Sequence, residues 1–306
     1  MTTSALLATL SPLVNRDDQT ANDDSQYGYV PQEAVAILFL ALYGISTVLH
    51  VGQAKYFRTW WLLPTAALCG IGELVGWSGR LWSSIDPTAD TPFIIQRTCA
   101  TILAPTPLLA ANFMIMARIV ERLGTSYSRL TPKSYTILFL PCDIIALVVQ
   151  GVGGGMASSA NDLDGANQGA NVMLGGIGFQ FGSVPFSLKG ILANGRSQCL
   201  RAHKGTPRGT FTPRLKFMLV ALAFSTTVLF IRSIYRLIEL SGGWEGPVIR
   251  TEVYFNVFDG GMVTLAIFTL NFVHPGIFLQ PDKAAYWHVK LQNMEYAKSR
   301  DELSAS

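Results

Sequence analysis

Apolar residues dominate seven stretches of this chain, each about twenty residues long. They are predicted at residues 31–51, 60–80, 93–117, 135–155, 169–192, 215–238 and 251–273. A helix of about twenty residues crosses the roughly 30 Å hydrocarbon core of a bilayer. Most of these stretches lack the polar stripe that a helix on the surface of a soluble protein carries. The pattern therefore predicts an all-α polytopic membrane protein, built as a bundle of seven transmembrane helices.

The composition agrees with this prediction. Of the 306 residues, 49% are hydrophobic and only 14% are charged. The charged fraction of an ordinary soluble domain is about 25%. The alternative, a soluble protein of long buried helices, is therefore disfavoured.

The basic residues predict how the chain is oriented in the membrane. Most of the 23 Lys and Arg residues fall in the connections 52–59, 118–134 and 189–216 and in the tail after residue 277. Because connections rich in Lys and Arg stay in the cytosol, we expect the N-terminus outside and the C-terminus in the cytosol. The predicted division is an exterior leader at 1–30, a transmembrane domain at 31–276 and a cytosolic tail at 277–306. We expect the plasma membrane, with internal membranes as the alternative.

Charged residues lie within or beside three of the spans, in pairs seven positions apart: Glu73 and Arg80, Arg232 and Glu239, and Glu252 and Asp259. Seven residues make about two helical turns, so each pair shares one face and differs in depth by about 10 Å. A lone charge at mid-membrane costs roughly 2.5 to 3.5 kcal/mol, so these side chains should face the bundle interior and pair. We expect Arg232 to bridge Glu73 or Asp259.

Other polar residues extend this candidate network: Gln96, Arg97, Asp143, Gln150, Gln180 and Arg236. Two interpretations remain open. The network locks the helices together, or it lines a polar cavity that receives a lipid headgroup or couples motion to protons. Both predict sensitivity to substitution, but only the second predicts dependence on a ligand.

Glycine and proline predict where the helices approach one another and where they bend. Glycines four apart, which allow close packing of helix backbones, occur at Gly72 and Gly76, Gly151 and Gly155, and Gly178 and Gly182. Kinks or local openings are expected at Pro105, Pro107, Pro141 and Pro185.

The chemical motifs of several enzyme classes are missing from the sequence. The four histidines are scattered without a His-x-x-x-His pair, and there is no Gly-x-Ser-x-Gly sequence and no phosphate loop. We therefore expect no metal, no cofactor and no catalytic residue, and transport driven by ATP on this chain alone is excluded. The span at 251–273 has no lysine, which argues against a retinal protein. An intramembrane lipid hydrolase is a lesser alternative, and no nucleic acid is expected to bind.

Taken in order, the polar motifs resemble the fungal lipid-translocating exporters, the RTA-like proteins. The segments that carry the resemblance are Tyr29 to Pro31, Glu73 to Arg80, Gln96 with Ala104 and Pro105, Asp143 with Gln150 to Gly155, Arg232 to Glu239, Glu252 to Tyr254, Asp259, and His274, Pro275 and Gly276. They extend over residues 29–276. Each piece alone is short, so the resemblance is specific only when the pieces are taken together as a set.

The resemblance implies membrane transport of amphipathic lipids, such as sphingoid long-chain bases, or of toxic lipid-like compounds, to which the protein would confer resistance. Its partners would be membrane lipids or amphiphilic small molecules. The residues His274 to Gly276 would belong to the family pattern at the cytosolic rim. The alternative is a seven-span sensor of lipid asymmetry or stress that signals through the basic loop or the tail.

Overall fold

The computed structural model describes residues 25, 27–123, 132–160, 162–200, 212–244 and 246–279, and all regular structure in them is helical. The long helices are α2 (Glu33–Tyr56), α3 (Leu68–Ile85), α5 (Pro105–Leu123), α6 (Pro132–Ser158), α7 (Leu163–Leu200), α8 (Pro213–Ser241) and α10 (Met262–Phe272). The short helices are α4 (Asp90–Gln96), α9 (Glu252–Phe255) and α11 (Pro275–Phe278). The prediction of an all-α protein is confirmed for these residues.

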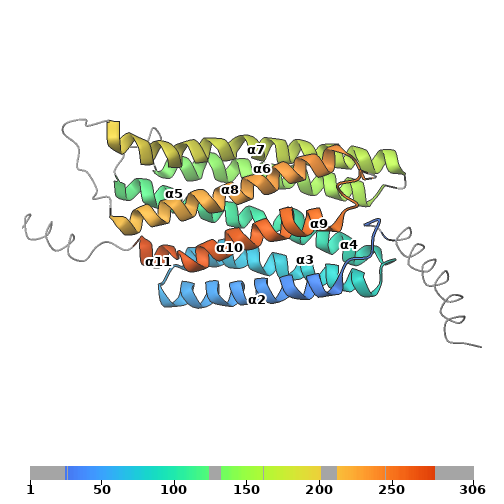
Figure 1. Ribbon diagram of the computed structural model, residues 1–306. Coiled ribbons are helices and arrows are strands. Elements are labelled where there is room, and N and C mark those ends of the chain that lie inside the picture. The colour runs from blue at the N-terminus through green and yellow to red at the C-terminus, as the bar shows by residue number, and fades with distance from the viewer. Residues whose placement is uncertain are drawn as a thin grey trace, which may run out of the picture.

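The helices run along one common axis and form an elongated bundle (Figure 1). Helix α6 packs along α7, α2 packs along α3, and α8 contacts both α7 and α10. One end of the bundle holds α4, α9 and the start of α2, and we call it the α4 end (Figure 1). The opposite end holds α11 and the start of α8, and we call it the α11 end. The sequence predicts that the α4 end faces outward.

Among the described residues, five helical stretches are long and apolar enough to cross a membrane. They are Glu33–Tyr56, Asp90–Ile119, Pro141–Ser158, Pro213–Ser241 and Glu252–Phe278. The predicted spans at 60–80 and 169–192 are helical too, in the segment that ends with α3 and in α7. The count of seven spans and the orientation of the termini stay predictions.

Polar and apolar side chains are distributed inside out relative to a soluble protein. On α2, Leu38 is 55% exposed and Val48 is 72% exposed, whereas Ser46 and His50 are fully buried. Apolar groups on the outside and polar groups on the inside suit a bundle that is surrounded by lipid. The chain is therefore an integral membrane protein with several spans.

In the described part of the chain, three π-helical segments interrupt the regular helices, at Leu63–Ala67 (η2), Arg97–Leu103 (η3) and Asn256–Gly261 (η5). Such segments are rare and often lie at functional sites. The segment η3 ends just before Pro105, which has no N–H to donate to the carbonyl of Thr101, four residues earlier. The predicted opening of the helix at Pro105 thus coincides with η3. Pro141, another position where a kink or opening is predicted, lies inside α6.

The glycine pairs give a mixed outcome. A Cβ atom on Gly76 would lie 2.4 Å from the Cβ of Ala100, and one on Gly72 would lie 2.9 Å from the Cβ of Ala104, so this pair does allow a close approach, here between α3 and the η3 segment. The prediction is wrong for the other two pairs, because a Cβ on any of their four glycines would meet nothing within 4 Å. Helices α6 and α7 approach instead at Gly153 and Gly169.

The predicted leader, basic loop and tail lie largely outside the described residues, at 1–24, 201–211 and 280–306. Their boundaries and roles therefore stay predictions. What the structure does describe is the bundle that carries nearly all of the predicted polar network.

Candidate functional site

The centre of the polar network is an ion pair between α8 and η5. The Nε atom of Arg232 lies 2.7 Å from Oδ1 of Asp259, and both side chains are at most 9% exposed. Arg232 also donates from Nη2 to the carbonyl of Thr101 at 2.7 Å. This is the carbonyl that Pro105 leaves without its helical donor, so a proline on one helix provides the acceptor for an arginine on another. Of the two predicted bridges, the structure contains the one to Asp259.

Glu73 lies in the same buried interior but without a hydrogen bond to its Oε1 atom from any described residue. The side chain is 1% exposed. Arg232 and Asp259 are its electrostatic neighbours, so a carboxylate, a guanidinium and a second carboxylate do gather as the helical spacing predicts. A buried oxygen without a hydrogen-bond donor is costly, because it has lost its water and gained no hydrogen bond in exchange. Glu73 is thus the acid of this cluster that is best placed to receive a ligand.

A second ion pair lies at the α4 end, between α3 and α9. Arg80 donates from Nη2 to Oε1 of Glu252 and to the hydroxyl of Tyr29, each at 3.1 Å. The aromatic rings of Tyr27, Tyr29, Trp77 and Phe255 have their centres 4.7 to 5.6 Å from its Cζ atom. Such rings stabilise a buried guanidinium through their quadrupoles. The residues before α2 thereby help to close this end of the bundle.

The third ion pair is internal to α8. Arg236 pairs with Glu239, one helical turn later, and both side chains are at most 3% exposed. The contact joins Nη1 of Arg236 to Oε2 of Glu239. The two charges therefore balance each other within α8.

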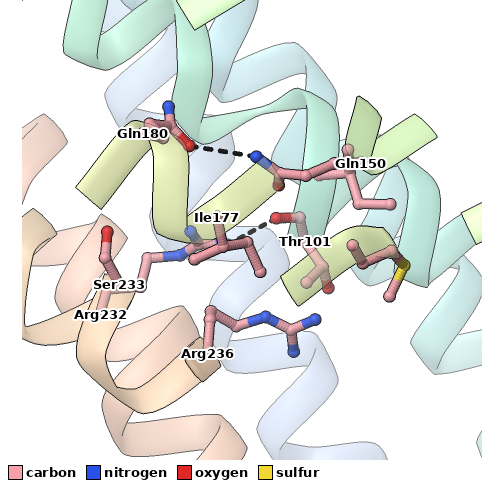
Figure 2. A pocket seen from close by; sticks show the side chains of 9 residues that line it. Thr101, Gln150, Ile177, Gln180, Arg232, Ser233 and Arg236 are labelled. Carbon is pink, nitrogen blue, oxygen red and sulfur yellow. Dashed lines mark hydrogen bonds between the residues drawn. The ribbon is translucent and has the colours of Figure 1, made fainter. Parts of the chain in front are cut away.

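Gln150 and Gln180 join α6 to α7 beside the central ion pair. Gln150 donates from Nε2 to Oε1 of Gln180 at 3.2 Å, and both line a small hollow with Thr101, Arg232 and Arg236 (Figure 2). The hollow has a volume of about 10 Å³, which is on the scale of one water molecule. In this conformation it is too small for a lipid headgroup.

Asp143 is fully buried on α6, seven residues before Gln150. Neither oxygen of its carboxylate accepts a hydrogen bond from the part of the chain that the structure describes. Gln180 is a polar neighbour, but Asp143 is not among the residues that line the hollow of Figure 2. It is therefore a second buried carboxylate, separate from the three ion pairs, with capacity to bind a cation.

The residues from His274 to Gly276 lie at the α11 end and form a helix cap. Nδ1 of His274 accepts a hydrogen bond from the backbone N–H of Gly276 at 3.1 Å and begins α11. The ring of His274 packs against Phe57, and a Cβ atom on Gly276 would lie 2.5 Å from the Cβ of Phe57. This packing gives the motif a structural role at the end of α10.

Sequence reasoning missed a polar stripe on α2, at Tyr43, Ser46, Thr47, His50 and Gln53. Tyr43 donates to the carbonyl of Gly260, Gln53 donates to the carbonyl of Asn271, and Asn271 donates to Ser46. The spacing of three and four residues was a signal for one helical face. The stripe joins α2 to α10 from the central charges toward the α11 end.

Among the described residues, no three metal-binding side chains come together.

The RTA1-like protein family matches the chain over residues 66–282. The chain belongs to this family. The match includes every charged residue of the three ion pairs, so the resemblance found in the polar motifs is confirmed.

Relatives of this RTA1-like chain are found in Saccharomyces cerevisiae and in Leptosphaeria maculans. The sphingoid long-chain base transporter RSB1 of Saccharomyces cerevisiae is 29% identical over 300 residues, which cover 88% of the chain and 78% of the relative. The lipid-translocating exporter-like protein RTA1 of Leptosphaeria maculans is 29% identical, over 90% of the chain and 56% of the relative. Protoporphyrin uptake protein 1 of Saccharomyces cerevisiae is 25% identical, over 80% and 90%. No solved structure matches the chain.

Proposed function

We propose that this protein moves amphipathic lipids, or toxic compounds that resemble them, across a membrane and so confers resistance to them. The observation that carries the proposal is a set of buried charges inside a helical bundle whose outer surface is apolar. Relatives named as a sphingoid long-chain base transporter and as a lipid-translocating exporter-like protein support the same activity. The protein acts as a carrier in the plasma membrane, with seven spans and an exterior N-terminus.

The substrate class that the acids fit best is a cationic amphiphile such as a long-chain base. Glu73 and Asp143 are buried carboxylates with oxygen atoms that lack a hydrogen-bond donor. An ammonium group supplies three N–H donors and one positive charge, which satisfy such a carboxylate. Asp259 is already held by Arg232, so it organises the site before the substrate arrives.

The structure corresponds to a closed state of this carrier. The hollow between Gln150, Gln180 and Arg232 has room for about one water molecule, so a headgroup enters only after helices move. The π-helical segments η3 and η5 carry Thr101 and Asp259, two partners of Arg232, and provide places where helices bend without breaking a regular ladder. Breaking the contacts of Arg232 would therefore accompany opening.

Transport of a labelled long-chain base by purified protein in liposomes tests the proposal. Wild-type protein should move the base across the bilayer, and Glu73→Gln should reduce the rate by about tenfold or more, because a hydrogen bond to a charged group contributes about 1.5 to 3 kcal/mol. Glu33→Gln makes the same chemical change at an exposed position in the first turn of α2 and should transport normally.

The alternatives make different predictions in the same experiment. A sensor that does not carry lipid would give no movement with well-folded wild-type protein, and this result would overturn the proposal. A lipid hydrolase would change the mass of the labelled base, whereas a carrier releases it unchanged. Equal transport by wild type, Glu73→Gln and Asp143→Asn would leave a carrier but refute the role of these acids.

A further inference from the structure

Arg97 is a half-buried cation that forms no ion pair with the acidic residues that the structure describes. It begins the η3 segment, just after α4, and its Nε and Nη2 atoms are buried without an acceptor among the residues that the structure describes. Its Cζ atom lies 4.1 Å from the centre of the Trp244 ring and 5.9 Å from that of Phe93. Aromatic rings stabilise a guanidinium, but they do not replace the hydrogen bonds that its N–H groups made to water.

Two further donors near Arg97 also lack an acceptor. The Nε2 atom of Gln96 and the Nε atom of Arg80 are buried and unbonded to any described residue. Gln96 is 3% exposed, and its Oε1 atom accepts a bond from the Tyr27 hydroxyl at 3.4 Å, so its NH₂ group is the end left over. These donors line one hollow with Tyr27, Trp244 and Glu239, and we call it the Arg97 hollow.

The carboxylates close to the Arg97 hollow are committed elsewhere. Glu239 lines the hollow but is paired with Arg236, and Glu252 is paired with Arg80. Arg97 has both Arg236 and Glu239 as electrostatic neighbours, and these two residues already pair with each other. Among the described residues that line the hollow, together with their ion-pair partners, three guanidinium groups therefore face two carboxylates. One positive charge and several N–H donors are left without a counterpart in the described part of the chain.

The chemistry that satisfies such a site is an oxyanion. A guanidinium fork and an amide NH₂ offer the donors that a phosphate or carboxylate accepts, and both pairings are strong when water is excluded. The Arg97 hollow has a free volume of only about 20 Å³, which is on the scale of one water molecule. A headgroup must therefore displace something that closes it.

Tyr27 is the side chain best placed to move. It lies before α2, and its hydroxyl is 3.4 Å from Gln96 and 3.5 Å from Ser83, at the long limit of hydrogen bonding. Burial raises the pKa of the Tyr27 phenol, so the group stays neutral and does not itself balance Arg97. Phe93 packs edge-on against it, with ring centres 4.8 Å apart. Tyr27 is thus a weakly bonded cover over the hollow.

We infer that the Arg97 hollow is a binding site for the acidic headgroup of an amphiphile, a phosphate or a carboxylate, held by Arg97 and Gln96 beneath Tyr27. The inference goes beyond the proposed movement of cationic lipids and does not depend on it. It is tested by binding alone, so failure of transport and failure of this site are separate results.

The test is equilibrium binding of three lipids with the same sixteen-carbon chain to the purified full-length protein in detergent micelles. Hexadecyl phosphate and hexadecanoate carry the two oxyanions, and hexadecylamine carries a cation. At least one oxyanion lipid should bind wild type, and Arg97→Gln should weaken that binding by about tenfold or more, since bonds to charged groups contribute about 1.5 to 3 kcal/mol. Binding of hexadecylamine should not weaken.

Two variants make the result decisive. Gln96→Glu keeps the acceptor for Tyr27 and places a carboxylate beside Arg97, so oxyanion binding should be lost while thermal stability does not fall. This variant tests the site even if Arg97→Gln does not fold. Arg118→Gln is the matched control, because the Cζ atom of Arg118 also lies over a tryptophan ring, 3.8 Å from the centre of Trp61. It should bind as wild type does.

The outcomes separate the sources of the oxyanion. Tighter binding of hexadecyl phosphate identifies a phosphate headgroup, and tighter binding of hexadecanoate identifies a carboxylate. Competition by inorganic phosphate as effective as that by hexadecyl phosphate identifies a free anion as sufficient. The inference is overturned if neither oxyanion lipid binds folded wild type, or if binding is unchanged in both Arg97→Gln and Gln96→Glu.

Discussion

At the scale of single residues, variants of Arg232 and Asp259 test whether their buried ion pair holds the central helices together. Arg232→Met leaves Asp259 buried without its cation, and breaking such a pair costs about 3 to 5 kcal/mol. The single variant should therefore lower the midpoint of thermal unfolding strongly. The double variant Arg232→Met with Asp259→Asn removes both charges and should recover much of that loss. Thermal unfolding of all four proteins in detergent measures the coupling.

A simple sum of the two single effects in the double variant would contradict this prediction. It would mean that the 2.7 Å contact contributes little and that other contacts of each residue decide its effect. The transport assay on the double variant adds a second result. Recovery of stability without recovery of transport would show that the pair serves function beyond holding the helices.

Which residues face the interior could be predicted from the sequence, but which residues pair could not. The spacing of seven placed Glu73 and Arg80 on one face, and the structure buries both. The choice of Asp259 over Glu73 as the partner of Arg232 depends on the rotation of three helices, which no local pattern specifies. The pairing of Arg80 with Glu252 follows from tertiary packing in the same way. So does the lack of an ion-pair partner for Arg97 among the described residues.

At the scale of helices, Gly76 is where α3 and the η3 segment come closest. A Cβ atom there would lie 2.4 Å from the Cβ and 2.6 Å from the backbone N of Ala100. Gly76→Ala should therefore push the two segments apart and destabilise the bundle by about 1 to 3 kcal/mol, the usual cost of overpacking. Gly155→Ala is the matched control, because a Cβ there would meet nothing within 4 Å. Thermal unfolding midpoints compare the two.

The control should be neutral or slightly more stable, since alanine favours a helix over glycine by up to about 1 kcal/mol. Equal destabilisation by both changes would show that glycine at these positions serves something other than close packing. An unchanged midpoint for Gly76→Ala would show that α3 and η3 shift to accept a methyl group at little cost.

Glycine spacing was an unreliable guide because it describes one helix and says nothing of its neighbour. Gly72 and Gly76 meet Ala104 and Ala100, whereas Gly155 has the same spacing from Gly151 and meets nothing. The π-helical segments were likewise beyond the sequence pattern, although Pro105 marked one of them. By contrast, the polar stripe on α2 was present in the sequence and needed only a count of its helical period.

At the scale of the whole molecule, the described charges divide into two unequal groups. The Arg97 hollow, at the α4 end, has a surplus cation at Arg97, and the centre has a surplus acid at Glu73. The two groups belong to one continuous bundle, in which Arg232, Arg236 and Glu239 lie on successive turns of α8. A substrate that carries an acidic and a basic group at different depths would pair with both Arg97 and Glu73. The proposed cation site and the inferred oxyanion site therefore suit different parts of one path.

The number of spans fixes on which side of the membrane each connection lies. If the segments that contain α3 and α7 both cross, Thr88 and Asp162 lie outside while Lys55 and Arg214 lie in the cytosol. All four side chains are exposed. Each is changed in turn to cysteine in a protein whose four native cysteines have been replaced. A maleimide that cannot cross membranes should label Thr88→Cys and Asp162→Cys on intact cells, and the other two only after permeabilisation.

Labelling after permeabilisation is the control, because all four cysteines should then react. Labelling of Thr88→Cys and Lys55→Cys from the same side would show that α3 does not cross, and the same result for Asp162→Cys and Arg214→Cys would show this for α7. Labelling of Lys55→Cys and Arg214→Cys alone on intact cells would invert the predicted orientation. The α4 end, with Arg97 and Tyr27, would then face the cytosol, and an acidic amphiphile would reach its site from inside the cell.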